Sequence, residues 1–237
     1  LQHEASHNAL SRSQLINTLG RYAVVPWSHP AVWLAVHVIN NDAIYATSVA
    51  FEYYEGLAVS SIEPVVGALG GGTLLTVRGS GFTPSTTALV RFGEHRAVVA
   101  RVLSSALLEC TSPSHVEPEL VAVEVTLNDR DYSSDEVLYE YQADASVAEL
   151  APRAGPSEGG TFVNVSGAGF SQRSATLGYL FVRFNTTAVP AVWVSSSELH
   201  CVAPEHASGL VSVELTLNDQ QYTSDQLHFE YVEVLLH

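Results

Sequence analysis

The feature that most constrains this chain is a stretch that occurs twice. Residues 71–82 read GGTLLTVRGSGF, and residues 159–170, which begin 88 positions later, read GGTFVNVSGAGF. In each copy a glycine pair is followed by apolar residues at every second position, which is the period of a β-strand. The Gly-x-Gly-Phe sequence then permits a sharp bend and returns the phenylalanine to the core. The chain is therefore predicted to contain a repeated β unit.

The second half of this unit is also repeated, and a further copy of it lies nearer the N-terminus. Alternating apolar residues lead into Asn128-Asp129 and into Asn218-Asp219, and a closing strand follows each pair. The same order appears in a strand over residues 32–40, the pair Asn41-Asp42 and a closing strand that carries Val49, Phe51 and Tyr53. Each copy is predicted to be a hairpin, because Asn and Asp tolerate a positive φ in a turn.

Alternation at equivalent positions predicts which side chains share a core and which face outward. Thr76, Arg78 and Glu124 are examples of the outward set. The core set of the first complete unit is Leu75, Val77, Val90, Phe92, Cys110, Val123, Val125 and Tyr139. The core set of the second is Val163, Val165, Val182, Phe184, Cys201, Val213, Leu215 and Phe229.

These repeats predict an all-β fold of tandem immunoglobulin-like β-sandwiches, since short strands alternate with turn signals and no long helical pattern occurs. The predicted boundaries are a partial unit over 1–55, complete units over 57–141 and 145–231, and a tail or the start of another unit over 232–237. The second complete unit holds four extra residues near 172–178, because the offset between the repeats grows from 88 to 92 there. The linkers Glu55-Gly56 and Gln142-Ala143-Asp144 are too short for free tumbling.

Composition excludes several classes of function. The net charge is −15 and all ten basic residues are scattered arginines, which disfavours a nucleic-acid partner. Because the sequence lacks lysine, Schiff-base chemistry and a P-loop lysine are excluded. No apolar run reaches the roughly 18 residues of a membrane span. The chain begins at Leu1 without a signal-peptide pattern, so we expect it to be an excerpt of a longer protein.

Motifs with chemical potential have a structural interpretation that is favoured in each case. The sequence Gly155-Pro156-Ser157-Glu158-Gly159 matches a nucleophile elbow by letter, but a strand rather than a helix follows it, so it is predicted to be a turn. Cys110 and Cys201 occupy the same position in different units and are predicted to be buried, unpaired thiols. We therefore predict neither a catalytic residue nor a cofactor, and the chain is predicted not to be an enzyme.

Metal binding is also not predicted. The ten histidines lack metal-ligand spacing. The acidic loops Asp129–Asp135 and Asp219–Asp225 could offer oxygen ligands to calcium, but Asp131 is replaced by Gln221 in the second copy. A solvated hairpin tip is the favoured interpretation of both loops.

Two tripeptides match the acceptor pattern for N-linked glycosylation. They are Asn164-Val165-Ser166, which lies within a strand, and Asn185-Thr186-Thr187, which lies at a hairpin tip. Both asparagines are expected to face outward. Asn185 is predicted to be the better site, because hairpin tips are accessible whereas a mid-strand asparagine has neighbours.

The order of these motifs resembles the IPT/TIG domain, an immunoglobulin-like fold found in plexins, the hepatocyte growth factor receptor, fibrocystin-type ciliary surface proteins and Rel-type transcription factors. The resemblance rests on Ile62-Glu63-Pro64, Gly-Gly-Thr, Gly-x-Gly-Phe, Val-x-Phe, Leu-x-Cys-x-x-Pro, and Asn-Asp followed by Tyr-Glu-Tyr or Phe-Glu-Tyr. Related domains often pair this cysteine with a second one, which is missing from each unit here.

The resemblance, the acidic charge and the sequons together predict a function at the cell surface or outside the cell. The leading hypothesis is a non-catalytic segment of a larger extracellular or cell-surface protein, of which a ciliary-surface protein is one case, serving as a structural spacer, adhesion or assembly module. Its partners would be proteins or further copies of itself, without nucleic acid. Two alternatives remain open at this stage: the stalk of a receptor ectodomain whose ligand site lies elsewhere, and an accessory module of a polysaccharide-acting enzyme.

Overall fold

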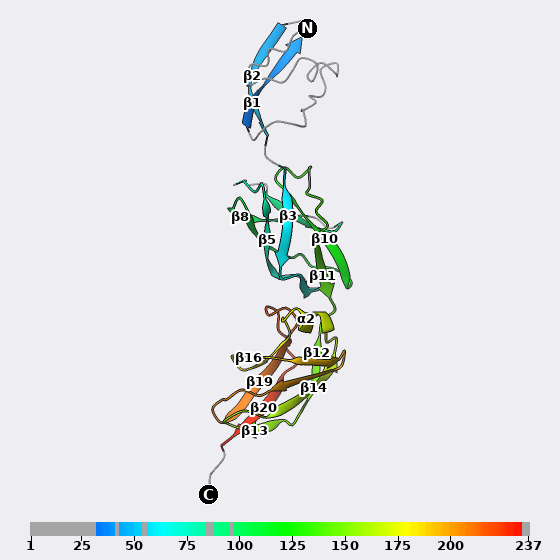
Figure 1. The fold of residues 1–237 in the computed structure, drawn as a ribbon, viewed down its shortest axis with the longest axis vertical. Helices are drawn as coiled ribbons and strands as arrows, with labels where there is room; N and C mark the ends of the chain where they lie inside the picture. Colours follow the sequence, from blue (N-terminus) through cyan, green and yellow to red (C-terminus); the bar gives the residue numbers. More distant parts are fainter. Residues whose placement is uncertain (1–31, 41–42, 54–55, 84–87, 95–96, 234–237) are drawn as a thin grey trace. The chain divides into compact units, whose positions relative to one another are not determined.

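The computed structural model describes residues 32–40, 43–53, 56–83, 88–94 and 97–233 (Figure 1). The chain divides into two units, the first ending at Leu57 and the second beginning at Ala58. In the first unit, β1 (Val32–Asn40) and β2 (Ala43–Tyr53) pair antiparallel, with Val32 opposite Tyr53. The strand predicted over residues 32–40 is therefore confirmed. The turn predicted at Asn41-Asp42 lies outside the described residues.

The second unit begins with a sandwich of two sheets, which we call the first sandwich. Its smaller sheet has the order β3-β5-β9-β8 and its larger sheet the order β4-β11-β10-β6-β7. The strands are β3 (Ala58–Glu63), β4 (Val66–Ala68), β5 (Leu74–Ser80), β6 (Leu89–Phe92), β7 (Val98–Val99), β8 (Arg101–Ser104), β9 (Leu107–Thr111), β10 (Glu119–Thr126) and β11 (Leu138–Gln142). Neighbouring strands are antiparallel except that β4 runs parallel to β11.

The second sandwich repeats this topology strand for strand. Its sheets have the orders β12-β14-β18-β17 and β13-β20-β19-β15-β16, and β13 is again parallel to its neighbour β20. The strands are β12 (Ser146–Ala151), β13 (Ala154–Pro156), β14 (Phe162–Ala168), β15 (Phe181–Phe184), β16 (Thr187–Pro190), β17 (Val192–Ser195), β18 (Glu198–Val202), β19 (Gly209–Thr216) and β20 (Leu227–Val232). The predicted all-β fold of tandem immunoglobulin-like sandwiches is confirmed.

Each sandwich encloses its own core, and all sixteen side chains predicted to be buried are buried. In the second sandwich the cluster joins residues of both sheets, including Val165 and Leu199 of one and Phe184 and Phe229 of the other. The rings of Phe184 and Phe229 meet edge to face with centroids 5.5 Å apart, a favoured arrangement for aromatic pairs. The alternation of apolar and polar residues therefore identifies the buried face of each strand that carries these side chains.

The bend after each repeated strand forms as the sequence predicts. Phe82 and Phe170 turn back into their cores and are buried. A Cβ atom at Gly79 would lie 2.0 Å from the carbonyl oxygen of Ala58, and one at Gly167 would lie 2.0 Å from that of Ser146. Glycine is needed at both positions because the first strand of each sandwich passes so closely.

The Asn-Asp pairs form turns, but the chain returns from them irregularly. Asp129 and Asp219 adopt φ values of +56° and +58°, as expected for residues tolerant of this region. After the first of these turns, the chain runs beside β10, with Ser133 N donating to Val125 O, before β11 begins at Leu138. The connection is thus a long loop that extends beyond the end of its sheet.

The four extra residues of the second sandwich contribute to a short helix, α2 (Gln172–Thr176), which the sequence did not predict. Ser171 caps its N-terminus by accepting a hydrogen bond from Ser174 N. The helix lies at the end of the second sandwich that is nearer to the first (Figure 1).

Candidate functional site at the junction of the sandwiches

The two sandwiches meet at a junction whose first part is made by the β19–β20 loop of the second sandwich. Asn218 Oδ1 accepts from the main-chain N–H groups of Gln220 and Gln221 at 3.1 and 3.0 Å, which fixes the turn. Both glutamine side chains are thereby directed at the first sandwich, where residues 72–74 lead into β5. The local sequence therefore positions the groups that make the contact.

Five side-chain hydrogen bonds join this loop to the first sandwich, and one of them runs from Gln221 Nε2 to Gly72 O at 3.2 Å. Gln220 Nε2 donates to Leu74 O at 2.9 Å, while its Oε1 accepts from Leu74 N at 2.8 Å. Asn218 Nδ2 donates to Thr73 Oγ1 at 3.1 Å, and Thr73 Oγ1 donates to Gln221 Oε1 at 2.9 Å. Thr73 is 0% exposed and Asn218 is 4% exposed, so the hydrogen bond between them is shielded from water, whereas the Gln220–Leu74 pair lies at the surface.

The second part of the junction joins helix α2 to the last strand of the first sandwich. The amide of Gln142 donates to Ser171 Oγ at 2.9 Å and accepts from Ser174 Oγ at 2.9 Å. Beside it, Arg173 and Glu140 form an ion pair of 2.7 Å. Because Gln142 and Ser174 are both buried, each has its polar atoms paired across the junction.

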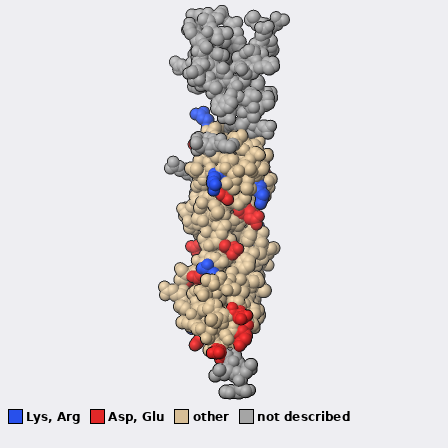
Figure 2. Space-filling model, turned by 90° about the vertical axis from the view of Figure 1, so that its left-hand side faces the viewer, with Lys and Arg blue, Asp and Glu red and all other residues tan. Residues whose placement is uncertain are grey.

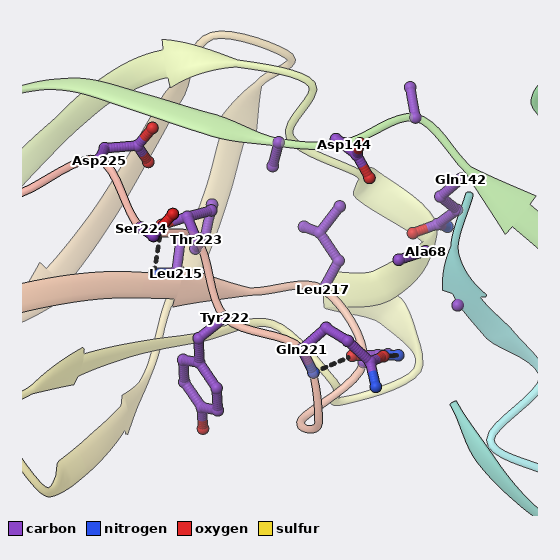
Figure 3. Close-up of a pocket in the computed structure, with 14 residues that line it drawn as sticks. Ala68, Gln142, Asp144, Leu215, Leu217, Gln221, Tyr222, Thr223, Ser224 and Asp225 are labelled. Carbon is purple, nitrogen blue, oxygen red and sulfur yellow. Dashed lines mark hydrogen bonds between the residues drawn. The ribbon is translucent and has the colours of Figure 1, made fainter. Parts of the chain in front are cut away.

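A hollow of about 270 Å³ lies between these two contacts (Figure 3). Gln142 and Asp144 line it from the link between the sandwiches, and Leu217, Gln221 and Asp225 line it from the β19–β20 loop. Its ionisable side chains other than tyrosine are the carboxylates Asp144 and Asp225, and the latter accepts a hydrogen bond from Val147 N at 2.8 Å. Among the described residues, no histidine, arginine or cysteine lines the hollow.

The acidic loops hold their carboxylates by structural contacts. Asp135 Oδ2 accepts from Val59 N at 2.7 Å, and Asp225 makes the equivalent contact with Val147, so each ties its loop to the first strand of its own sandwich. Asp129 accepts from Tyr132 OH at 2.8 Å. Across the described part of the chain, no group of three or more His, Cys, Asp or Glu side chains is arranged to hold a metal ion.

The cysteines and the serine of the elbow-like sequence lie where the sequence predicts. Cys110 and Cys201 are buried and unpaired, and burial raises the pKa of each thiol from 9.0 to about 12. Such thiols are poor nucleophiles at neutral pH. Ser157 lies in a turn after β13, with its N–H donating to Val232 O at 2.9 Å.

The two sequon asparagines lie on different sheets of the second sandwich. Asn185 is exposed in the turn between β15 and β16, with φ +57°. Its Nδ2 lies 3.3 Å from His206 Nε2. Asn164 is half-buried in the central strand β14, and its Nδ2 donates to Glu198 Oε1 at 2.9 Å.

Sequence reasoning missed the junction, although its signals were visible as differences between the repeats. Arg130 and Asp131 in the first loop are replaced by Gln220 and Gln221 in the second, and the extra residues before β15 supply helix α2. Features that the repeats share maintain the sandwich. Several features that distinguish the second sandwich, namely Gln220, Gln221 and helix α2, contact its neighbour, together with the shared Asn218.

The IPT/TIG domain family model matches residues 57–141 and residues 145–231. The chain belongs to this family. Mouse fibrocystin-L is 30% identical over 190 residues, which cover 78% of this chain and 4% of that protein. Mouse plexin-B2 is 28% identical over 182 residues, which cover 74% of this chain and 10% of that protein. The chain therefore spans a small part of the length of these relatives.

Among solved structures, the extracellular region of plexin A4 is similar, with a TM-score of 0.47, 21% identity, and coverage of 75% of this chain and 18% of that one. Together with its relatives, the chain is an extracellular, cell-surface segment of tandem TIG domains. In the described residues, no helix has the length and apolar character needed to cross a membrane.

Proposed function

We propose that this segment is a non-catalytic spacer that holds consecutive TIG domains in a fixed relation within a larger cell-surface protein. The observation that carries this proposal is the hydrogen-bond network at the junction, in which Thr73, Asn218 and Gln142 are buried and Gln220 is exposed. Gln220 and Gln221 bind the main chain of the first sandwich, and Gln142 binds helix α2 on the other side of the hollow. Contacts at separate points oppose bending of one sandwich on the other.

Several observations support a role without catalysis. In the hollow at the junction, Asp225 is held by the main-chain N–H of Val147. The cysteine thiols are buried with raised pKa values, and Ser157 lies in a turn. A spacer of this kind would act through protein partners, or through further copies of itself, at the cell surface. We propose that its role is to set the spacing and orientation at which neighbouring domains present such surfaces.

We further propose that residues 1–55 are the C-terminal half of another TIG unit. The antiparallel pair β1–β2 corresponds in its order and alternation to the pairs β10–β11 and β19–β20. We also propose N-linked glycosylation of Asn185, whose exposed turn leaves the side chain accessible. Asn164 is the poorer acceptor because its amide is half-buried between neighbouring strands and already donates to Glu198.

Spin-label distance measurements test the spacer proposal. The exposed residues Ser60 and Ser208 lie in different sandwiches, and labels on cysteines placed there report the relation between the two. The natural thiols are buried and would stay unlabelled in the folded protein. We expect a single narrow distance distribution in the otherwise unchanged chain, and a broad one in the variant Gln220→Ala/Gln221→Ala.

The chain offers a matched control in the equivalent loop of the first sandwich. The variant Arg130→Ala/Asp131→Ala removes side chains from the same two loop positions but leaves the junction unchanged, so the narrow distribution should persist. A broad distribution in the unchanged chain would show that the sandwiches move independently, and the spacer proposal would fail.

A further inference from the structure

The edge of the first sandwich that Gln220 binds is open because of the register of its strands. We call residues 72–74 the junction edge. Ser112 N donates to Thr73 O, so the next main-chain groups of the strand, those of Leu74, point away from β9. On their other side, β3 ends its pairing at Glu63 and is followed by Pro64, which has no N–H. Gln220 occupies the place that a longer β3 would fill.

The same edge exists in the second sandwich, at its opposite end from the junction. We call residues 160–162 the distal edge. Ala203 N donates to Thr161 O, so the N–H and C=O of Phe162 point away from β18. Strand β12 ends its pairing at Ala151 and is followed by Pro152. The distal edge therefore presents the same donor and acceptor pair, together with the hydroxyl of a threonine at the same position.

Burial distinguishes the two edges. Thr73 in the junction edge is 0% exposed, whereas Thr161 in the distal edge is half-buried. The side chains of Leu74 and Phe162 are similarly exposed, at 53% and 58%. The edges differ in that Gln220 pairs with the main chain of Leu74, whereas the described part of the chain supplies no equivalent side chain beside Phe162. Glu140, which pairs with Arg173 at the junction, corresponds to Glu230, which is exposed. The distal edge thus repeats the polar groups of the junction edge without their cover.

The distal edge also has more negative charge around it than the junction edge has. Glu158 and Glu205 are exposed there, at the positions that Gly70 and Ser114 occupy beside the junction edge. On the face shown in Figure 2, acidic side chains gather at the end of the described surface next to the C-terminal residues. An occupant of this end should therefore carry cationic side chains as well as hydrogen-bonding groups.

We propose that the distal edge is a docking surface for a further immunoglobulin-like domain, which pairs a primary-amide side chain with the main chain of Phe162 and an arginine with Glu230. The commitment to this occupant comes from the junction, where a domain of the same fold covers the equivalent groups with Gln220 and Arg173. The proposal rests on the spacer function and deepens it by naming the next contact.

A chain extended by a second copy of its own sandwich tests this directly. A second copy of residues 143–232, without ¹⁵N, is ligated after Val232 of a ¹⁵N-labelled chain. The signal of Phe162 in the original chain is then read separately from that of the copy. Amide hydrogen exchange of Phe162 should slow about tenfold relative to the unextended chain, because its N–H gains a partner. The control extension carries Gln220→Ala and Arg173→Ala in the added copy, and the exchange rate of Phe162 should then return to that of the unextended chain.

Leu74 in the same molecule provides the reference, because its N–H already has the partner that Phe162 is expected to gain. If Leu74 stays protected and Phe162 exchanges at the unextended rate, the docking proposal is overturned while the spacer function stands. Equal slowing by the intact and the altered copy would also overturn it, since the amide and arginine would not be responsible. Failure of the spacer function is read separately, from the spin-label distances of the unextended chain.

Discussion

The side-chain amide of Gln220 pairs with the main chain of Leu74 as one rung of a β-ladder would, donating to its C=O at 2.9 Å and accepting from its N–H at 2.8 Å. A side chain from one sandwich thereby completes the sheet edge of the other. Because β3 is terminated by Pro64, the first sandwich cannot fill this position itself. The junction is therefore a consequence of where the first strand stops.

Replacing Gln220 should expose this edge in a graded manner. We expect Gln220→Ala to speed amide exchange of Leu74 by about two- to tenfold, which corresponds to one lost hydrogen bond. Gln220→Glu keeps an acceptor for Leu74 N but places a carboxylate oxygen near Leu74 O. The exchange rate of the Leu74 amide in this variant should therefore lie between those in the unchanged protein and in Gln220→Ala. The control is Arg130→Ala, at the equivalent position of the first loop. Identical rates in all four proteins would show that this amide does not protect the edge.

The two cores should respond to truncation independently of each other. Phe92→Ala and Phe184→Ala each remove a fully buried ring that contacts other aromatic rings, and each should cost its own sandwich about 3–5 kcal/mol. Thermal unfolding followed by a spectroscopic probe placed in each sandwich distinguishes the two unfolding transitions. A variant that melts as the unchanged protein does would contradict the core assignment.

The sequence predicted these cores because strand alternation is a local property that burial of one face makes visible. It also predicted the positive φ of Asp129 and the bend that buries Phe82, since both follow from the demands of a turn. The junction could not be predicted in the same way. Glutamine at position 220 is compatible with a solvated loop, and only the placement of a second sandwich beside Leu74 gives it a partner.

Helix α2 illustrates the same limit. Its five residues are too few to show a helical period. Serine, found at positions 171 and 174, is favoured in turns as well as at helix N-caps. The role of these two serines depends on Gln142, which lies 29 positions from Ser171 and 32 from Ser174 in sequence and reaches them across the junction. Features that depend on one distant neighbour show no periodic pattern in the sequence around them and are visible only as differences between the repeats.

The carboxylates of the acidic loops should contribute to stability in the absence of calcium. Asp135→Ala and Asp225→Ala each leave a main-chain N–H of the first strand without its partner, and we expect a loss of about 1 kcal/mol in the affected sandwich. Asp129→Asn, which keeps a side chain tolerant of the positive φ at this position and changes a carboxylate that accepts from the Tyr132 hydroxyl, serves as the control. Chemical denaturation with and without chelator measures both effects, and a chelator effect that disappears in Asp225→Ala would instead indicate a bound cation.

Glycosylation should distinguish the two sequons. In protein secreted from cells that add N-linked glycans, we expect Asn185→Gln to remove one glycan mass and Asn164→Gln to leave the mass of the glycans unchanged. The exposed turn at Asn185 and the half-buried position of Asn164 are the reasons for this order. Intact-mass spectrometry before and after enzymatic deglycosylation provides the measurement. Occupancy of Asn164 alone would show that exposure in the folded domain does not determine which site is used.

The buried thiols should make the sandwiches sensitive to alkaline pH. Burial raises the pKa of Cys201 from 9.0 to about 12, so the folded state keeps a proton that the unfolded state loses in this interval. The stabilisation from this thiol is therefore complete below pH 9 and declines as the pH rises toward 12, by up to about 1.4 kcal/mol per pH unit.

In Cys201→Ala this contribution is absent. The substitution lowers stability at neutral pH by leaving a small cavity, but its curve of unfolding free energy against pH should fall less steeply above pH 9 than that of the unchanged protein. The buried tyrosines, whose pKa values are also raised, remain in both proteins, so the difference between the two curves reports the cysteine alone. Parallel curves between pH 9 and 12 would mean that the thiol ionises as readily in the folded sandwich as in the unfolded chain.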